Sequence, residues 1–327
     1  MKILVTGSSG YIGQCFTEYV CDEQDVSKDL VFCTDRGERT KNKSLESYRP
    51  EYRFCQASIG DEKLANFILD REIDTIFHFA AKADVADSTV NPMSYFKDNV
   101  SDFTLLMSRL IERGWKGTII NSSSAAVYGN YDHVISEHFP LAPVNAYGSS
   151  KVMVENILKE LWDVHGITSI SLRYFNVVGN YKNYFDHYTS GHIFQKILYS
   201  YDNKIPFKIF GTDYPTPDGT CVRDYISIFD VMRANFFAFM HHQDSPGCFQ
   251  YNVSTGRGVS IKQVIDTFEL FLQDSIMIEE SYRRAGDPIS LVGHNGALQR
   301  IGWRPKRSRL DKIIGQLVDK HRGKNAD

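Results

Sequence analysis

The chain lacks several features that would assign it to a class of protein at once. Its six cysteines form no Cys-x-x-Cys pair and no cluster with histidine, so the sequence predicts neither a zinc site nor a disulfide framework. No window approaches about 18 uninterrupted apolar residues, and the apolar run at residues 3–5 is too short for a signal peptide. We therefore expect reduced thiols, no membrane segment, no metal and a cytoplasmic location.

Neither sign of charge dominates. The chain has 37 Lys and Arg against 40 Asp and Glu, a net charge of −3, and no block of like charges. A nucleic-acid partner is therefore not expected. Hydrophobic residues make up 42% of the 327 positions, an ordinary composition for one large or two modest globular domains.

Short apolar runs alternate with longer helical patterns in the first half of the chain. The runs predict buried strands at residues 3–5, 30–33, 75–79 and 118–120. Alternating strands and helices favour an α/β fold with a doubly wound parallel sheet of the Rossmann type. Further strands are predicted at 224–226 and 249–253, and these would return the chain to the sheet before a smaller C-terminal lobe.

Two long helices are predicted, over residues 91–114 and 147–166. Gly114 and Gly166 lie where a helix-ending glycine is expected. Both stretches carry apolar residues beyond one narrow stripe. That surplus could pack on the sheet alone or also against a second copy of the chain, and we favour a homodimer.

Three glycines lie between the first predicted strand and a helical stretch over residues 12–20. Gly7, Gly10 and Gly13 would let the turn tighten and the backbone approach a pyrophosphate at the helix N-terminus. Their spacing differs from the Gly-x-Gly-x-x-Gly fingerprint, and a plain turn is the alternative. The preceding strand favours dinucleotide binding.

Asp35 ends the second predicted strand, where a carboxylate can accept both ribose hydroxyls and would repel a 2′-phosphate. It favours NAD over NADP as the cofactor. Arg36 follows it and could instead receive such a phosphate, and both residues could simply belong to a solvated turn.

Tyr147 and Lys151 are four residues apart, so both side chains would project from one face of a helix that begins near Ala146. A neighbouring ammonium and the positive nicotinamide of NAD both favour the phenolate, which would make Tyr147 a base for a hydroxyl proton. Ser124 would hydrogen-bond the same oxygen. Alone, the pair could be two exposed helix residues; with the glycine loop it predicts redox chemistry on a hydroxyl.

These residues give the chain a resemblance to the extended short-chain dehydrogenase/reductase family, and within it to the nucleotide-sugar 4-epimerases. The resemblance covers nearly the whole chain. The motifs that carry it are residues 5–13, 78–81, Asn99, 122–129, 147–151, 173–176, 210–220, 222–226 and 283–288.

The resemblance implies NAD-dependent 4-epimerisation of a UDP-hexose. Tyr147 would deprotonate the 4-hydroxyl, NAD would take the hydride of carbon 4, and the 4-keto sugar would turn over before the hydride returns. The implied cofactor-binding residues are Gly7, Gly10, Tyr11, Ile12, Gly13, Asp35, Ser58, Ile59, Phe79, Ala80, Ala81, Asn99, Ser122, Tyr147, Lys151 and Phe175. The implied substrate-binding residues are Ser124, Asn176, Phe210, Arg223, Arg284, Asp287 and Leu291.

Two arginines for one diphosphate also match its charge. The alternatives are an ion pair with a nearby aspartate for Arg223 and a solvated charge for Arg284. We assign residues 1–174 and 222–254 to an NAD-binding domain, and residues 175–221 and 255–327 to a nucleotide-sugar-binding lobe.

The sequence departs from the family at several positions. Ser58 and Ala83 replace an aspartate and a lysine expected near the cofactor, which predicts weaker cofactor binding. Gly191 and His192 replace a pair that would touch uracil. Leu291 aligns with a bulky aromatic of strict glucose/galactose epimerases, so we expect N-acetylhexosamines, such as those of UDP-GlcNAc and UDP-GalNAc, to be accepted too.

Other functions compete with this one. A 4,6-dehydratase is disfavoured because no acid follows Ser124 in residues 125–128. A uronate 4-epimerase or decarboxylase on the same scaffold stays open. A non-catalytic NAD-binding regulator is disfavoured because both Tyr147 and Lys151 are present.

Overall fold

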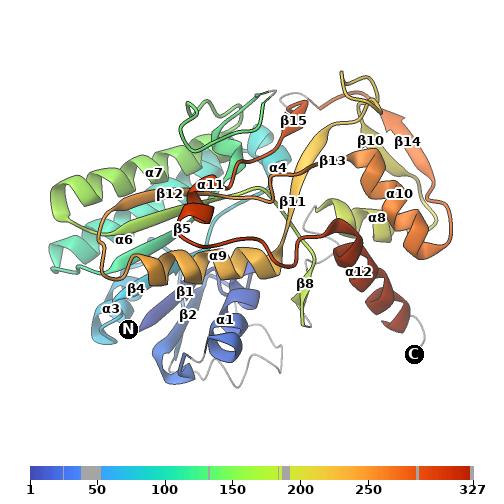
Figure 1. Cartoon of the computed structure of the whole chain (residues 1–327). Helices are drawn as coiled ribbons and strands as arrows, with labels where there is room; N and C mark the ends of the chain where they lie inside the picture. The colour runs from blue at the N-terminus through green and yellow to red at the C-terminus, as the bar shows by residue number, and fades with distance from the viewer. Residues whose placement is uncertain are drawn as a thin grey trace. The chain divides into compact units, whose positions relative to one another are not determined.

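The computed structural model describes residues 1–24, 26–37, 53–131, 133–182, 184–185, 192–284 and 287–324. The chain divides into two compact units (Figure 1). The first unit comprises Met1–Val127, Asn145–Arg173 and Met232–Tyr251, and the second comprises Tyr128–Val144, Tyr174–Val231 and Asn252–Asp327.

A seven-stranded sheet with the order β12-β6-β5-β4-β1-β2-β3 is the centre of the first unit. Neighbouring strands from β5 to β3 pair in parallel. The predicted doubly wound parallel sheet is thus confirmed. Its strands are β1 (Ile3–Thr6), β2 (Val31–Asp35), β3 (Phe54–Gln56), β4 (Thr75–His78), β5 (Thr118–Ser124), β6 (Ser169–Tyr174) and β12 (Cys248–Val253).

Helices cover both faces of this sheet (Figure 1). On one face α3, α6 and α7 bury apolar side chains, among them Leu64, Phe103 and Leu158. On the other face Phe77 of β4 contacts Phe16 of α1 and Phe239 of α9, with ring centres 4.4 and 5.5 Å apart. The helices are α1 (Tyr11–Glu23), α3 (Glu62–Asp70), α4 (Val85–Val90), α5 (Pro92–Tyr95), α6 (Asp102–Glu112), α7 (Ala146–His165) and α9 (Ile228–His241).

Helix α7 begins and ends where its sequence signals predict. The Asn145 side chain caps its first turn by accepting from the Gly148 N–H at 2.8 Å. Gly166, with φ of +67°, follows its last residue in the left-handed conformation that glycine adopts without strain.

The sequence pattern predicted one uniform helix over residues 91–114, and the structure differs. This stretch contains α5, a π-helical segment Phe96–Ser101 and then α6. The π-helical segment holds the buried Asn99, whose side chain bonds to Ser150 of α7 and to the backbone of Lys82. A wider turn at this point is typical of functional regions.

The second unit contains shorter sheets and four helices among its described residues. Strand β11 pairs with β7, β13 and β15, and β10 pairs in parallel with β14. Helices α8, α10 and α12 enclose a core that includes Phe194, Phe268 and Ile314. The elements are β7 (Asn176–Val178), β8 (Asn180–Tyr181), β9 (Tyr184–Phe185), α8 (Ile193–Asp202), β10 (Phe207–Phe210), β11 (Val222–Ser227), β13 (Gly258–Ser260), α10 (Ile261–Leu272), β14 (Ile278–Ser281), β15 (Ser290–Leu291), α11 (Gly296–Arg300) and α12 (Leu310–Lys324).

The two strands predicted in the second half differ in their partners. β12 joins the seven-stranded sheet beside β6, as expected. β11 does not join it, because its hydrogen-bonding edges are taken by strands of the second unit. The predicted division into cofactor and substrate domains concerns ligand binding, and we keep it as a proposal.

Candidate active site

The glycine loop connects β1 to α1 through backbone contacts that leave no room for larger residues. Gly7 has φ of +61°, and a Cβ there would lie 2.7 Å from the Ala80 backbone nitrogen. A Cβ on Gly13 would lie 2.3 Å from the Gly7 carbonyl oxygen. Gly10 forms the N-cap of α1 and makes no side-chain cap hydrogen bond, and a helix N-terminus of this kind favours an anion.

This loop therefore fits the diphosphate of a dinucleotide. The Ser9 hydroxyl is buried there and has no hydrogen-bond partner in the part of the chain that the structure describes. Tyr11 and Ile12 form the first turn of α1. A close backbone approach, a helix N-terminus and an unsatisfied hydroxyl are features that suit a bound diphosphate.

Asp35 lies at the carboxyl end of β2, where the sequence placed it. Its carboxylate accepts from the Ser9 and Gly37 N–H groups, each at 3.1 Å, and so faces the glycine loop. Arg36 forms an ion pair with Asp98 at 3.0 Å, and Lys82 lies 3.5 Å from the same carboxylate. The guanidinium that could have received a 2′-phosphate is thus engaged by an anion.

The other predicted cofactor residues of the first unit follow the carboxyl ends of neighbouring strands. Ser58 and Ile59 follow β3, and Phe79, Ala80 and Ala81 follow β4. Ser122 lies within the last residues of β5. In a parallel sheet these ends share one edge, which is where such folds bind ligands.

Asn99 has a structural function that the sequence did not reveal. Its amide donates to the Lys82 carbonyl at 3.0 Å and to the Ser150 hydroxyl at 2.9 Å, and its carbonyl accepts from the Lys82 N–H at 2.8 Å. The side chain joins the loop after β4 to α7. Its predicted contact with the cofactor stays a prediction.

The first turns of α7 bring the predicted catalytic residues to the end of β5. Lys151 is 4% exposed and donates to the Ser122 carbonyl at 2.6 Å. Its ammonium lies 5.9 Å from the centre of the Tyr147 ring. Ser124 interacts with the Tyr147 side chain, and its predicted hydrogen bond to the substrate oxygen stays a prediction. The structure thus brings Ser124, Tyr147 and Lys151 together.

Burial shifts both titratable groups toward their neutral forms. It raises the pKa of Tyr147, and the hydrogen bond from Ser124 opposes that shift. It lowers the pKa of Lys151 to about 8, with the Glu155 carboxylate acting in the opposite direction. The surrounding protein groups therefore leave Tyr147 biased toward the neutral phenol.

Sequence reasoning missed the charged pair behind Lys151. Glu155 and Arg173 are both buried and form two hydrogen bonds, from Nε to Oε1 at 3.0 Å and from Nη2 to Oε2 at 2.6 Å. The Ser123 hydroxyl donates to the same carboxylate at 2.5 Å. A glutamate four residues after Lys151, on the same helical face, was the available signal.

Buried His78 lies at the end of β4. Its Nδ1 is 3.0 Å from the Thr6 hydroxyl, which accepts from the Ala80 N–H at 3.2 Å. Burial and the charge of Lys151 lower the pKa of His78 to about 3, so the ring is neutral. It ties the loop after β4 to the end of β1.

Three of the predicted substrate residues lie on adjacent strands of the second unit. Asn176 of β7 pairs with Tyr225 of β11, and Leu291 of β15 pairs with Arg223 of β11. Phe175, the remaining predicted cofactor residue, precedes β7 and is buried. The strand register thus brings the Asn176, Arg223 and Leu291 segments together.

The predicted arginines have specific partners. Arg223 lies 3.7 Å from the Asp287 carboxylate and donates to the Pro288 carbonyl at 2.9 Å, so the alternative of an ion pair with an aspartate is present in the structure. Arg284 stacks on Phe210 with its guanidinium 3.7 Å from the ring centre. Of the two residues expected to replace a uracil contact, Gly191 lies outside the described residues and His192 is the N-cap of α8.

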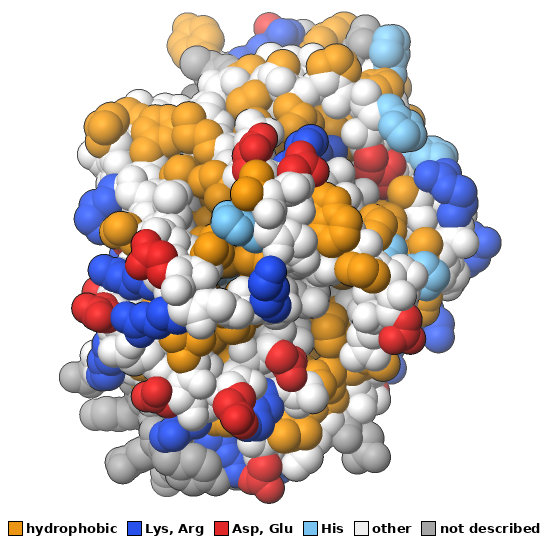
Figure 2. Space-filling view, turned by 90° about the vertical axis from the view of Figure 1, so that its left-hand side faces the viewer, with side chains coloured by type: hydrophobic (Ala, Val, Ile, Leu, Met, Phe, Trp, Pro, Cys, Tyr) orange, Lys and Arg blue, Asp and Glu red, His pale blue; other side chains and the backbone are white. Residues whose placement is uncertain are grey.

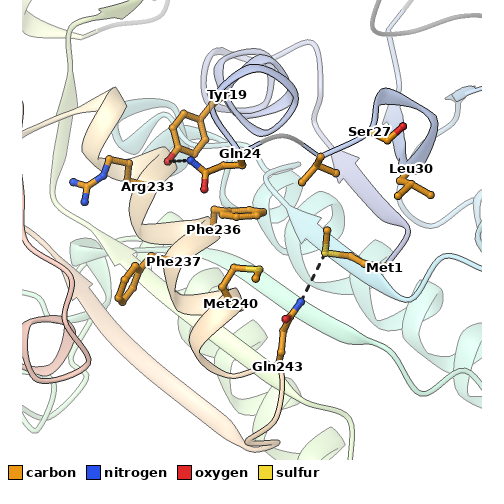
Figure 3. A pocket seen from close by; sticks show the side chains of 11 residues that line it. Met1, Tyr19, Gln24, Ser27, Leu30, Arg233, Phe236, Phe237, Met240 and Gln243 are labelled. Carbon is orange, nitrogen blue, oxygen red and sulfur yellow. Dashed lines mark hydrogen bonds between the residues drawn. The ribbon is translucent and has the colours of Figure 1, made fainter.

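A pocket of about 880 Å³ lies elsewhere in the first unit, between α1 and α9 (Figure 3). None of the predicted site residues lines it. Among its lining residues, Gln24 donates to the Tyr19 hydroxyl at 2.8 Å and Gln243 to the Met1 sulfur at 3.9 Å, and Ser27 and Arg233 also line it.

Comparison with known proteins decides the family. Residues 3–254 match the profile of the NAD dependent epimerase/dehydratase family. The chain belongs to this family. A UDP-glucose 4-epimerase of Lactobacillus helveticus is 34% identical to it over 98% of this chain and 97% of its own. The predictions of the family and of dependence on NAD are confirmed.

Solved structures of epimerases have the same fold. The UDP-glucose-4-epimerase from Stenotrophomonas maltophila, with bound NAD and formylated UDP-arabinopyranose, has a TM-score of 0.88 and 29% identity, over 100% of this chain and 99% of its own. The UDP-Glc/GlcNAc 4-epimerase from Campylobacter jejuni has a TM-score of 0.80 and 30% identity, over 98% and 99% of the two chains.

The family name covers two kinds of chemistry, and the residues after β5 bear on the choice. The stretch after Ser124 forms a short helical turn, Ala125–Val127, with no carboxylate to remove a proton or protonate a leaving hydroxyl. The prediction that disfavours a dehydratase rests on these residues.

The described residues of this epimerase/dehydratase family member contain no group of three or more His, Cys, Asp or Glu side chains arranged to hold a metal ion. No helix within them has both the length and the apolar character needed to cross a membrane. All six cysteines are free thiols.

Proposed function

We propose that this protein interconverts UDP-glucose and UDP-galactose by NAD-dependent epimerisation at carbon 4. The observation that carries the proposal is the contact of Tyr147 and Lys151 with the end of β5, in a chain about one third identical to UDP-glucose 4-epimerases over nearly its whole length. A proton-transferring tyrosine beside the nicotinamide end of a dinucleotide site is what reversible oxidation of a hydroxyl requires.

Three side chains of the first unit have defined parts in this reaction. NAD, when bound, supplies a reversible two-electron acceptor for carbon 4. Tyr147 takes the proton of the 4-hydroxyl and later returns it, while Ser124 hydrogen-bonds the oxygen and holds it in line. Lys151 places a positive charge near the tyrosine, which favours its ionised form.

The second unit supplies the contacts for the nucleotide. Arg223 and Arg284 would bind the diphosphate with Asn176, since guanidinium groups form paired hydrogen bonds with phosphate oxygens. Asp287 would accept from the nucleotide ribose. Binding then exchanges the contact of Arg223 with Asp287 and that of Arg284 with Phe210 for contacts with the ligand.

We propose further that the N-acetylated pair, UDP-GlcNAc and UDP-GalNAc, is accepted. The proposal depends on Leu291, a side chain smaller than an aromatic residue, which lies in β15 beside Arg223. The similarity to a structure described as a UDP-Glc/GlcNAc 4-epimerase supports it.

The experiment is to incubate the purified protein with NAD and, separately, with UDP-glucose or UDP-GlcNAc, and to follow the 4-epimers by NMR. Conversion of both substrates is expected. Conversion of UDP-glucose alone would contradict the wider substrate range, and conversion of neither would contradict the proposed function.

A second copy of the chain is the proposed protein partner. Large apolar side chains reach the surface on the helices of the first unit: Val90 and Met93 are 76% and 74% exposed, and Val164 of α7 is 69% exposed. Hydrophobic side chains gather in several groups on the face shown in Figure 2. Sedimentation velocity should show a dimer, and Val164→Glu should shift it toward the monomer.

A further inference from the structure

Helix α7 contacts the end of β5 through three side chains, not only the two that the reaction uses. They are spaced four residues apart and therefore lie in line on one face of the helix. The contacts are Tyr147 with Ser124, Lys151 with the Ser122 carbonyl at 2.6 Å, and Glu155 with the Ser123 hydroxyl at 2.5 Å.

The third contact is fixed from behind by a buried charge. Arg173 of β6 forms two hydrogen bonds with Glu155, and the two side chains are 5% and 4% exposed. A carboxylate buried to this extent is costly unless its charge is paired and its oxygens accept hydrogen bonds. Arg173 and Ser123 meet both conditions, and so they fix Glu155 between α7, β5 and β6.

The charged and titratable groups around Lys151 act on it in different ways. Tyr147 on the same helix is uncharged when its phenol is protonated, and His78 from β4 is neutral. Glu155 is the carboxylate that stabilises the Lys151 ammonium against the effect of burial. Arg173 from β6 is the hydrogen-bonded counter-ion of Glu155, so this one carboxylate acts on two cations, Arg173 and Lys151.

We propose that Glu155, anchored by Arg173 and Ser123, is a positioning residue that keeps Lys151 protonated and directed at the end of β5. The effect of Glu155 on turnover rests on the proposed function. Its effect on the protonation of Lys151 does not rest on that function, because it can be measured without substrate or cofactor.

The first test is the titration of Lys151 itself. In cofactor-free protein with ¹⁵N-labelled lysine, the Lys151 side-chain resonance is assigned by its loss in Lys151→Met. The pKa of Lys151 should lie near 8 in the native protein. In Glu155→Gln, which keeps the shape and removes the charge, it should fall by about one pH unit, the low end of the effect of an opposite charge.

The control is Asp163→Asn, which removes a carboxylate paired with Lys159 on the exposed side of the same helix. It should leave the Lys151 titration unchanged. If Glu155→Gln lowers the melting temperature but the Lys151 titration stays where it was, Glu155 is merely structural and the proposal is wrong. Glu155→Gln also leaves the Arg173 charge without its carboxylate, so the double variant Glu155→Gln/Arg173→Gln, which removes both charges, should lower the pKa of Lys151 as well. It also serves if Glu155→Gln alone does not fold.

The second test is the pH dependence of kcat with UDP-glucose and NAD. Loss of the Lys151 proton should set the alkaline limb of the kcat profile. Glu155→Gln should move this limb to lower pH by as much as it lowers the pKa of Lys151 in the NMR titration. Ser123→Ala, which removes an anchor but no charge, should lower kcat a few-fold with the limb unchanged. If the native protein converts no substrate, the proposed function fails, and the NMR titration still decides this proposal.

Discussion

Tyr147 illustrates how the protein and its cofactor share the task of making a base. Burial favours the neutral phenol, and the hydrogen bond with Ser124 only partly offsets it. A buried group with this bias stays protonated until a positive charge arrives. In the proposed reaction, this links proton transfer to the oxidised, cationic form of the cofactor, which is the form required when the 4-hydroxyl is deprotonated.

Replacing the phenol should therefore abolish turnover without emptying the cofactor site. We expect Tyr147→Phe to lower kcat by about 10²–10⁴-fold, the usual contribution of general acid–base catalysis, while the purified protein still binds NAD. Coupled kinetics and NAD titration measure both effects. Tyr95→Phe is a control, because Tyr95 is buried 6.5 Å from the Tyr147 ring and bonds to Asp84 and Asp87 instead. Activity within a few-fold of native in Tyr147→Phe would exclude it as the base.

Leu291 should set the substrate range. Leu291→Tyr fills the space proposed for the acetamido group, so kcat/KM for UDP-GlcNAc should fall at least about ten-fold more than that for UDP-glucose. Leu291→Met keeps the side-chain volume and should change kcat/KM little for either substrate. Equal losses for both substrates in Leu291→Tyr would show that this side chain does not lie beside the sugar 2-substituent.

At the scale of the element, the junction of β1 and α1 has little tolerance for change. Gly13 faces the Gly7 carbonyl so closely that even a methyl group requires the loop to move. We expect Gly13→Ala to weaken NAD binding by about ten-fold or more, measured by isothermal titration. Gly166→Ala is the matched control: its φ of +67° makes alanine strained, but nothing lies within 4 Å of the added Cβ. It should lower stability and leave NAD affinity unchanged.

How far the elements could be predicted depended on whether their signals are local. Helix α7 has its cap at Asn145 and its left-handed glycine at Gly166, so its bounds followed from the sequence. The π-helical segment within 91–114 did not, because the extra residue per turn is stabilised by Asn99 bonding to Lys82 and Ser150, which are distant in sequence. β11 was recognised as a strand, but its partners β7, β13 and β15 are distant in sequence, so local signals could not predict which sheet it joins.

The same distinction applies to the site. The glycine loop and the spacing of Tyr147 and Lys151 are short patterns, and they predicted which residues meet at the end of β5. The pair of Glu155 and Arg173 joins residues 18 apart on different elements, and although the spacing from Lys151 places Glu155 on the same helical face, the sequence does not show that Arg173 is buried against it. Chemistry carried by one helical face was therefore predictable, and the support behind it was not.

At the scale of the whole molecule, the active-site lysine should affect stability. The pKa of Lys151 is about 8 in the folded protein, against the ordinary lysine value of 10.5 that applies to the unfolded chain. Below pH 8 the ammonium is present in both states, and folding bears the full cost of burying it. Between pH 8 and 10.5 the unfolded chain binds more protons than the folded one, so the contribution of Lys151 to stability becomes more favourable as pH rises.

Comparing the native protein with Lys151→Met isolates this contribution. The free energy of unfolding of the native protein, relative to that of the variant, should increase by up to about 3 kcal/mol between pH 8 and 10.5, as the shift implies at 1.36 kcal/mol per pH unit. Urea unfolding of the cofactor-free proteins at several pH values measures it. The thiol of Cys21, with its pKa raised to about 12, contributes an opposite trend, but it is present in both proteins and cancels in the difference. A difference that stays flat across this range would mean that the Lys151 ammonium is not destabilised in the fold, which would also remove the reason for Glu155 to stabilise it.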